Sequence, residues 1–179
     1  MVVTGTAAAP HVLEHHALEL WDPAVPDSRQ PYHAGLGLEP AHAAPIVQRA
    51  CDAARAIALV AVQKLVAAVR AAGCEPHGVG LVVGSDGDPT KIANPHVRAH
   101  ASEGRLFREI LEAGAAAQEL PCFVLVEQGA YEEAAKALHR GVGSLQRAVT
   151  ELGRTVPGPW RAEEKTAALA AWLALARRG

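Results

Sequence analysis

Two unbroken apolar runs mark strands in the second half of the chain. Residues 79–84 (VGLVVG) and residues 122–126 (CFVLV) have no polar position, which is typical of strands buried on both faces of a parallel sheet. The helix predicted over residues 95–118 is long enough for the crossover that parallel strands require. We therefore predict a β-α-β unit. Its two strands would end side by side, where open α/β sheets bind ligands.

The first half of the chain predicts three weaker strands and one long helix. Residues 1–6, 11–20 and 31–38 mix or weakly alternate apolar and polar positions, and a proline-containing loop precedes the third of them. The helix is predicted over residues 44–72, where apolar positions recur at helical spacing. Pro45 would lie in its first turn, and Gly73 follows its end.

The remaining elements complete an alternating order. Further helices are predicted over residues 131–139 and 144–152, and a C-terminal helix is predicted from about residue 160 to residue 176. The order is β-β-β-α-β-α-β-α followed by the C-terminal helix. It predicts an α/β fold with a mixed sheet of about five strands, and the length of 179 residues favours a single domain over residues 1–179.

Composition narrows the functional classes. The formal charge of −2 gives no overall basic signal for nucleic acid, although arginines recur on the predicted helices. Three unevenly spaced cysteines indicate reduced thiols, and neither a signal peptide nor a membrane-spanning run is visible. We expect a cytoplasmic protein that does not enter a membrane. Its alanine- and leucine-rich helix faces allow a homodimer without requiring one.

Three segments of the second half carry a more specific signal. They are residues 80–88 (GLVVGSDGD), 124–134 (VLVEQGAYEEA) and 163–172 (EEKTAALAAW). In this order and spacing they resemble the ribonuclease H-like superfamily. Within it they are most similar to the YqgF/RuvX group, the RuvC-related proteins of Holliday-junction resolvase type. The resemblance implies a three-layer ribonuclease H-like fold and a role on structured DNA or RNA.

The resemblance also implies a set of site residues. Two-metal phosphodiester cleavage needs several carboxylates around Mg²⁺ or Mn²⁺, and the matching acids here are Asp86, Glu127 and Glu164. They would be both the catalytic residues and the metal ligands of a divalent-metal-dependent nuclease. Separately from the resemblance, Arg98 and Arg105 fall on one predicted helix and would contact the nucleic acid; the alternative is that they are solvated side chains of a helix face. Each acid also has a structural interpretation, since Asp86 suits a turn and Glu164 suits the first turn of a helix.

Departures from the family pattern leave two functions open. The family's first strand carries an aspartate in an Asp-x-Gly turn, whereas residues 1–5 here contain no acid. Gly129 stands where the family has an arginine. The chain is therefore either a divergent nuclease or a catalytically inactive relative that binds nucleic acid or protein.

A second group of residues offers different chemistry. His96 and His100 are four residues apart and Glu103 follows three later, so one helix face would carry all three. Histidine pairs with a nearby acid are compatible with zinc or another transition metal. The alternative interpretation is that these are ordinary surface histidines.

Overall fold

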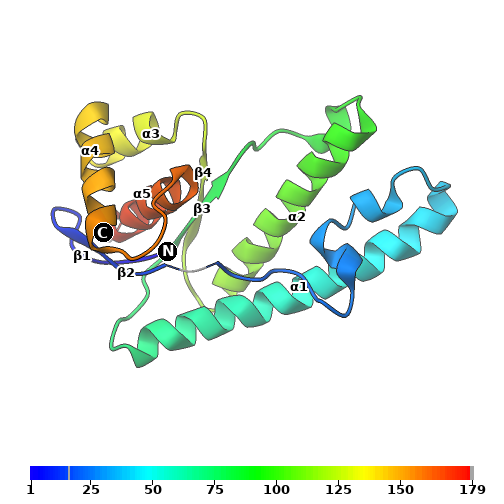
Figure 1. Ribbon diagram of the computed structural model, residues 1–179, viewed down its shortest axis with the longest axis horizontal. Helices are drawn as coiled ribbons and strands as arrows, with labels where there is room; N and C mark the ends of the chain where they lie inside the picture. Colours follow the sequence, from blue (N-terminus) through cyan, green and yellow to red (C-terminus); the bar gives the residue numbers. More distant parts are fainter. Residues whose placement is uncertain (16, 178–179) are drawn as a thin grey trace. The chain divides into compact units, whose positions relative to one another are not determined.

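The computed structural model describes residues 1–15 and 17–177 (Figure 1). Over these residues the chain forms both helices and strands, so the predicted α/β class is confirmed. The strands are β1 (Val2–Gly5), β2 (Pro10–Glu14), β3 (Val79–Val83) and β4 (Cys122–Val126). The α-helices are α1 (Pro40–Ala71), α2 (Pro95–Ala116), α3 (Ala130–Ala137), α4 (Val142–Leu152) and α5 (Ala162–Ala176). Short 3₁₀ helices are η1 (Pro26–Arg29), η2 (His33–Gly35), η3 (Pro89–Lys91) and η4 (Gly153–Thr155).

The predicted five-stranded mixed sheet is wrong. The described strands form two separate pairs, an antiparallel β1–β2 hairpin and a parallel β3–β4 pair. The parallel pair runs in register from Val79 opposite Cys122 to Val83 opposite Val126. The two apolar runs therefore pair as predicted, but neither strand continues into a larger sheet among the described residues.

The third predicted strand, residues 31–38, is a 3₁₀ turn instead. The backbone N–H of Leu36 donates to the carbonyl of His33, and Gly35 donates to Tyr32, so these groups bond locally and not to a neighbouring strand. Gly35 lies against α1, where a Cβ atom would stand 2.8 Å from Cγ2 of Val47. The close contact with α1 therefore determines the conformation of this segment. It overrides the weak alternation of apolar and polar positions from which the strand was predicted.

The contacts within the chain divide it into two compact units. Unit 1 contains Met1–Ala17, Ala72–Gly84 and Glu119–Gly179, and unit 2 contains Leu18–Ala71 and Ser85–Gln118. The chain passes from one unit to the other several times. In particular, strands β3 and β4 belong to unit 1, whereas the crossover helix α2 between them belongs to unit 2.

Helix α5 forms the centre of unit 1. From Ala167 on it is apolar around its whole circumference, with Leu169, Trp172 and Leu173 buried, and it packs against strands of both pairs and against α3 and α4 (Figure 1). The indole N–H of Trp172 donates to the carbonyl of Ala7 at 2.9 Å. Gly80 allows α5 to approach β3, because a Cβ atom there would lie 2.6 Å from the carbonyl oxygen of Ala170.

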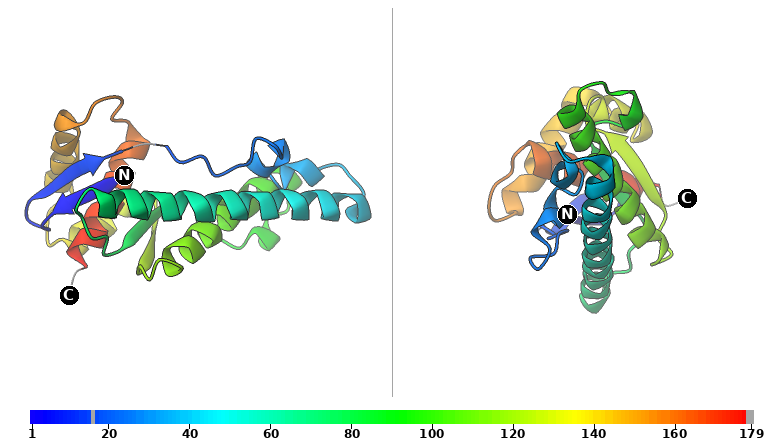
Figure 2. Two further views of the ribbon diagram at one scale, coloured as in Figure 1. Left: turned by 90° about the horizontal axis from the view of Figure 1, so that it is seen from below. Right: turned by 90° about the vertical axis from the view of Figure 1, so that its right-hand side faces the viewer.

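Unit 2 is built on the pairing of α1 with α2. The long helix begins at Pro40, four residues before the predicted start, and the core of the unit consists of buried side chains from both helices. These are Cys51, Ala54, Ala58, Leu106 and Ile110. Small residues bring the helices close: a Cβ atom on Gly114 would lie 3.0 Å from Val62. Figure 2 shows the segment with η1 and η2 running back alongside α1, which both 3₁₀ helices contact.

Candidate metal centre

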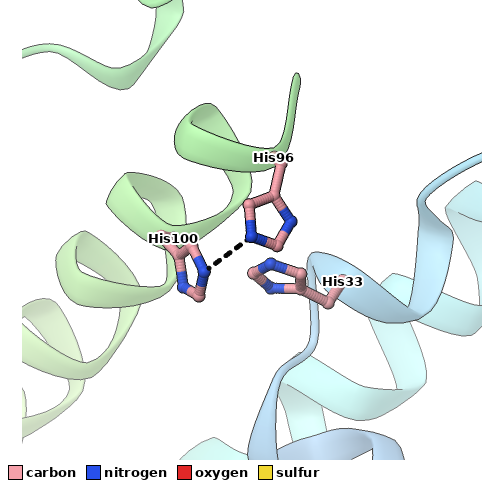
Figure 3. A group of neighbouring side chains, drawn as sticks. All are labelled: His33, His96 and His100. Atoms are coloured by element: carbon pink, nitrogen blue, oxygen red, sulfur yellow. Dashed lines mark hydrogen bonds between the residues drawn. The ribbon is translucent and has the colours of Figure 1, made fainter. Parts of the chain in front are cut away.

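Three histidines meet within unit 2. His33 comes from η2, and His96 and His100 come from the first two turns of α2. One nitrogen from each imidazole lies within 4.8 Å of the nitrogens from the other two. Figure 3 shows the three rings turned toward one another. Among the described residues, this is the group of potential ligands that comes close enough to hold a metal ion.

The start of α2 fixes two of the three rings. The side chain of Asn94 caps the helix by accepting the backbone N–H groups of His96 and Val97, and Pro95 occupies the first turn. The four-residue spacing then brings Nε2 of His96 to 3.2 Å from Nε2 of His100, where the two rings share a hydrogen bond (Figure 3). Two nitrogens bound to one tetrahedral zinc at about 2.0–2.1 Å are roughly 3.3 Å apart. This pair therefore already has the spacing of metal ligands.

Glu103 orients the third ring. Its carboxylate is buried, and Oε1 lies 2.8 Å from Nδ1 of His33 and accepts the backbone N–H of the same residue at 3.2 Å. An ionised carboxylate only accepts hydrogen bonds; opposite one, Nδ1 of His33 would carry the proton and Nε2 would have the free lone pair. The other oxygen, Oε2, lies 3.8 Å from Nδ1 of His100.

Nε2 of His33 is the least satisfied atom of the group. It is buried and has no hydrogen-bond partner. A buried polar atom without a partner costs about 1–3 kcal/mol, so such atoms require an explanation. The His33 ring lies 4.2 Å from the His100 ring and 4.8 Å from the His96 ring, measured between centroids. A cation held by the three rings would satisfy this nitrogen.

Burial makes the group closed on one side and open on the other. The His33 side chain is 15% exposed and the Glu103 side chain 9%, whereas the His100 side chain is 53% exposed. His96 is also exposed. Solvent therefore reaches the side chains of His96 and His100, which gives an ion a path of entry toward the buried Nε2 of His33.

The three acids implied by the family resemblance have separate surroundings. Asp86 is exposed in the loop after β3 in unit 2, and Glu127 is exposed at the end of β4 in unit 1. Glu164, also in unit 1, accepts the backbone N–H of Arg161 at 2.7 Å and so supports the start of α5. These acids belong to two different units, and their convergence on a metal stays a prediction.

The two arginines predicted to bind nucleic acid are engaged within unit 2. Arg98 donates to the carbonyl of Ile92 at 3.1 Å, and Arg105 is paired with Glu109 at 2.7 Å. Arg105 lines an open pocket that carries more acidic than basic side chains. The pocket is lined by Ser85, Asp86, Gly87, Asp88, Ala101, Arg105, Arg108, Glu109 and Glu112. Such a lining does not favour phosphate, so the role of these arginines remains a prediction without structural support.

Several titratable groups of unit 2 have a pKa that is shifted from the ordinary value. Burial raises the pKa of the Cys51 thiol and of the Tyr32 hydroxyl. Hydrogen bonds from the side chain and backbone of Thr90 lower the pKa of Asp88, while the hydrogen bond to Glu109 raises the pKa of Arg105. The Asp88 and Arg105 shifts come from hydrogen bonds within the unit, and neither marks a general acid or base.

His33 is the functional residue that the sequence did not reveal. Helical spacing connects His96, His100 and Glu103, but no local spacing connects His33 to residues more than sixty positions away. The one available signal was Glu103 itself. It lies on the same face of the predicted helix as apolar Leu106 and Ile110, and an acid on a buried face needs a partner from elsewhere in the chain.

Comparison with known proteins gives no family to which the chain can be assigned. No family model matches the sequence, and neither a curated protein nor a solved structure matches it. None of the described helices is both long and apolar enough to cross a membrane.

Proposed function

We propose that this protein binds a divalent transition-metal ion, with zinc as the best fit, through His33, His96 and His100. The observation that carries the proposal is the convergence of three imidazoles around a buried nitrogen, Nε2 of His33, that lacks a hydrogen-bond partner. Imidazole suits Zn²⁺, Cu²⁺, Ni²⁺ and Fe²⁺, and Zn²⁺ accepts the tetrahedral spacing of the His96–His100 pair.

The donor atoms favour zinc over the ions expected from the family resemblance. Mg²⁺ and Mn²⁺ prefer oxygen ligands, and their predicted ligands were the carboxylates Asp86, Glu127 and Glu164. The histidine group offers three nitrogens instead. A nuclease activity with Mg²⁺ or Mn²⁺ stays a separate prediction. Incubating the protein and its Asp86→Asn variant with a four-way DNA junction or hairpin RNA would test it.

A bound ion would also connect parts of unit 2 that are distant in sequence. His33 precedes α1, whereas His96 and His100 lie on α2, so a shared metal ties the η2 segment to the second helix. Ligands held in place by the folded chain bind better than the same residues in the unfolded chain. Metal binding therefore stabilises the fold of this unit.

Isothermal titration calorimetry on untagged, metal-stripped protein tests the proposal. We expect one Zn²⁺ per chain. The substitutions His33→Ala, His96→Ala and His100→Ala should each weaken binding by at least about tenfold, since loss of even an outer-shell partner of a metal ligand costs this much. His42→Ala is the matched control, because His42 is an exposed histidine on α1 of the same unit. It should bind like the unmodified protein.

Two results would overturn the proposal. One is the absence of stoichiometric Zn²⁺ binding by the unmodified protein. The other is an equal loss of affinity in His42→Ala and His33→Ala, which would mean that binding occurs at scattered surface histidines. Circular dichroism on each variant verifies that unit 2 remains helical when the affinities are compared.

A further inference from the structure

Glu103 contacts two of the three histidines on the same side of their rings. Its Oε1 lies 2.8 Å from Nδ1 of His33, and its Oε2 lies 3.8 Å from Nδ1 of His100. Both rings therefore present Nδ1 to the carboxylate and direct Nε2 elsewhere. For His100, that nitrogen lies 3.2 Å from Nε2 of His96. Only the His33 contact is short enough to be a hydrogen bond, so the buried acid can determine which nitrogen is free on His33, whereas Nε2 of His100 is hydrogen-bonded to His96.

This arrangement separates Glu103 from the position that a metal would occupy. A zinc ion lies about 2.1 Å beyond the nitrogen that binds it. Nδ1 and Nε2 point away from each other on the imidazole ring, so an oxygen bonded at Nδ1 is more than about 6 Å from an ion bound at Nε2. From this position Glu103 cannot both bond Nδ1 of His33 and bind the metal ion. The helical spacing had made it a candidate ligand, whereas its contacts are those of an orienting residue.

Among the described residues, the group then supplies three protein ligands and no fourth. In the described part of the chain, the side chains that gather here are the three histidines. The side of the group formed by His96 and His100 is exposed, and the side formed by His33 and Glu103 is buried. The remaining position of a tetrahedral ion would consequently face solvent. In zinc enzymes with three protein ligands, that position holds water or substrate.

We propose that Glu103 is a positioning residue that makes His33 offer Nε2, and that the bound metal keeps one exchangeable position open to water or a small anion. This inference rests on the proposed metal binding for its second part. Its first part concerns the metal-free protein. Carboxylate–histidine–metal arrangements use the same division of roles, in which the carboxylate fixes the tautomer and orientation of the ligand.

The tautomer of His33 tests the first part without any metal. Nitrogen-15 NMR of the metal-free protein should show the proton of His33 on Nδ1. In Glu103→Leu, which has a similar volume and no acceptor, the proton should move to Nε2. Glu109→Leu is the matched control, since Glu109 lies on the exposed, charged side of the same helix and should leave His33 unchanged. Glu103→Gln keeps an acceptor oxygen and should preserve the Nδ1 proton.

A His33 proton on Nε2 in the unmodified protein would overturn the positioning role, and so would an unchanged tautomer in Glu103→Leu. If Glu103→Leu fails to fold, Glu103→Gln still decides the question through cobalt affinity. A positioning role predicts a smaller loss in Glu103→Gln than in Glu103→Asp, whose shorter side chain cannot reach Nδ1 of His33. The opposite order contradicts it.

Cobalt, used in place of zinc, tests the open position through its visible absorption. Addition of azide to the Co²⁺-loaded protein should change the spectrum, because the anion enters the free position. Glu103→Leu should bind Co²⁺ about 10–100-fold more weakly but show the same bands at saturation. Altered bands at saturation would make Glu103 a ligand, and an unresponsive spectrum would mean that no position is open. Failure to bind Co²⁺ and Zn²⁺ at all would reject the metal site, while the tautomer result would remain valid.

Discussion

Oε1 of Glu103 makes two hydrogen bonds with His33: it lies 2.8 Å from the ring Nδ1 and accepts the backbone N–H at 3.2 Å. The two residues are seventy positions apart. One buried oxygen therefore holds both the orientation of the imidazole and the position of the η2 backbone that carries it. This contact brings a histidine from the loop before α1 to the two histidines of α2.

Zinc should raise the thermal stability of the protein. At a free Zn²⁺ concentration of one hundred times Kd, binding to the folded state alone adds about 2.7 kcal/mol to the free energy of unfolding. Calorimetric melting with and without Zn²⁺ measures this shift. We expect the shift to disappear in His33→Ala and to persist in His42→Ala. A shift that survives in His33→Ala would place the bound zinc elsewhere.

Two glycine substitutions should have opposite effects. Gly80→Ala should lower the free energy of unfolding by about 1–3 kcal/mol, because its methyl group would meet the carbonyl of Ala170 at 2.6 Å, and a backbone atom cannot rotate away. Gly104→Ala should raise it by about 0.5–1 kcal/mol, since Gly104 lies in α2 with open space around it. Urea unfolding measures both. Equal effects would mean that α5 does not approach β3 as described.

Cys51 should be the least reactive thiol in the folded protein. It is 4% exposed, and burial raises its pKa, so little of the nucleophilic thiolate forms near about pH 8. Mass spectrometry after brief iodoacetamide treatment should show slower labelling of Cys51 than of the half-buried Cys74 and Cys122. Its neutral form favours the folded state below the pKa of an unfolded cysteine, and that contribution is lost as pH rises through the raised folded value. Equal labelling without denaturant would contradict the packing of α1 on α2.

Asp88 should titrate below the usual range of aspartates. Its carboxylate accepts the hydroxyl of Thr90 at 2.8 Å and the backbone N–H of Thr90 at 3.0 Å, and these bonds lower its pKa. The stabilisation they provide is present above the ordinary aspartate pKa and is lost as pH falls through the lowered folded value. The amide shift of Thr90 in an NMR titration reports the midpoint.

Thr90→Val separates the two bonds to Asp88. It removes the hydroxyl, which is the larger cause of the shift, and keeps the backbone donor. The midpoint should therefore move part of the way back toward the ordinary value. An unmodified protein that titrates at or above the ordinary value would show that the loop does not hold Asp88 in this way.

Elements with strong local signals were predictable, and contacts between elements were not. The run of Cys122–Val126 matches β4 at both ends, because its limits are set by Pro121 before it and polar residues after it. The helical period likewise placed His96, His100 and Glu103 on one face of α2. His33 was missed because its position depends on how residues 31–38 pack against α1, and local polarity does not encode that packing.

The prediction of a five-stranded sheet was wrong for a related reason. Two apolar runs and a long helix predict a crossover unit, and β3 and β4 do pair in parallel. The helix between them buries its apolar side against α1 in unit 2, and the two other described strands pair only with each other. Order along the chain limits which sheets can form. It does not determine which neighbouring element a helix packs against.

The division of the chain into interleaved segments also sets an order for folding during synthesis. All residues of unit 2 have been made once Gln118 has left the ribosome, whereas unit 1 needs α5, Ala162–Ala176, at its centre. Because domains fold as units when their residues become available, the helix pair and its three histidines can assemble before the later segment of unit 1, Glu119–Gly179, has been completed. A nascent chain stalled shortly after residue 118 would already contain the complete ligand set.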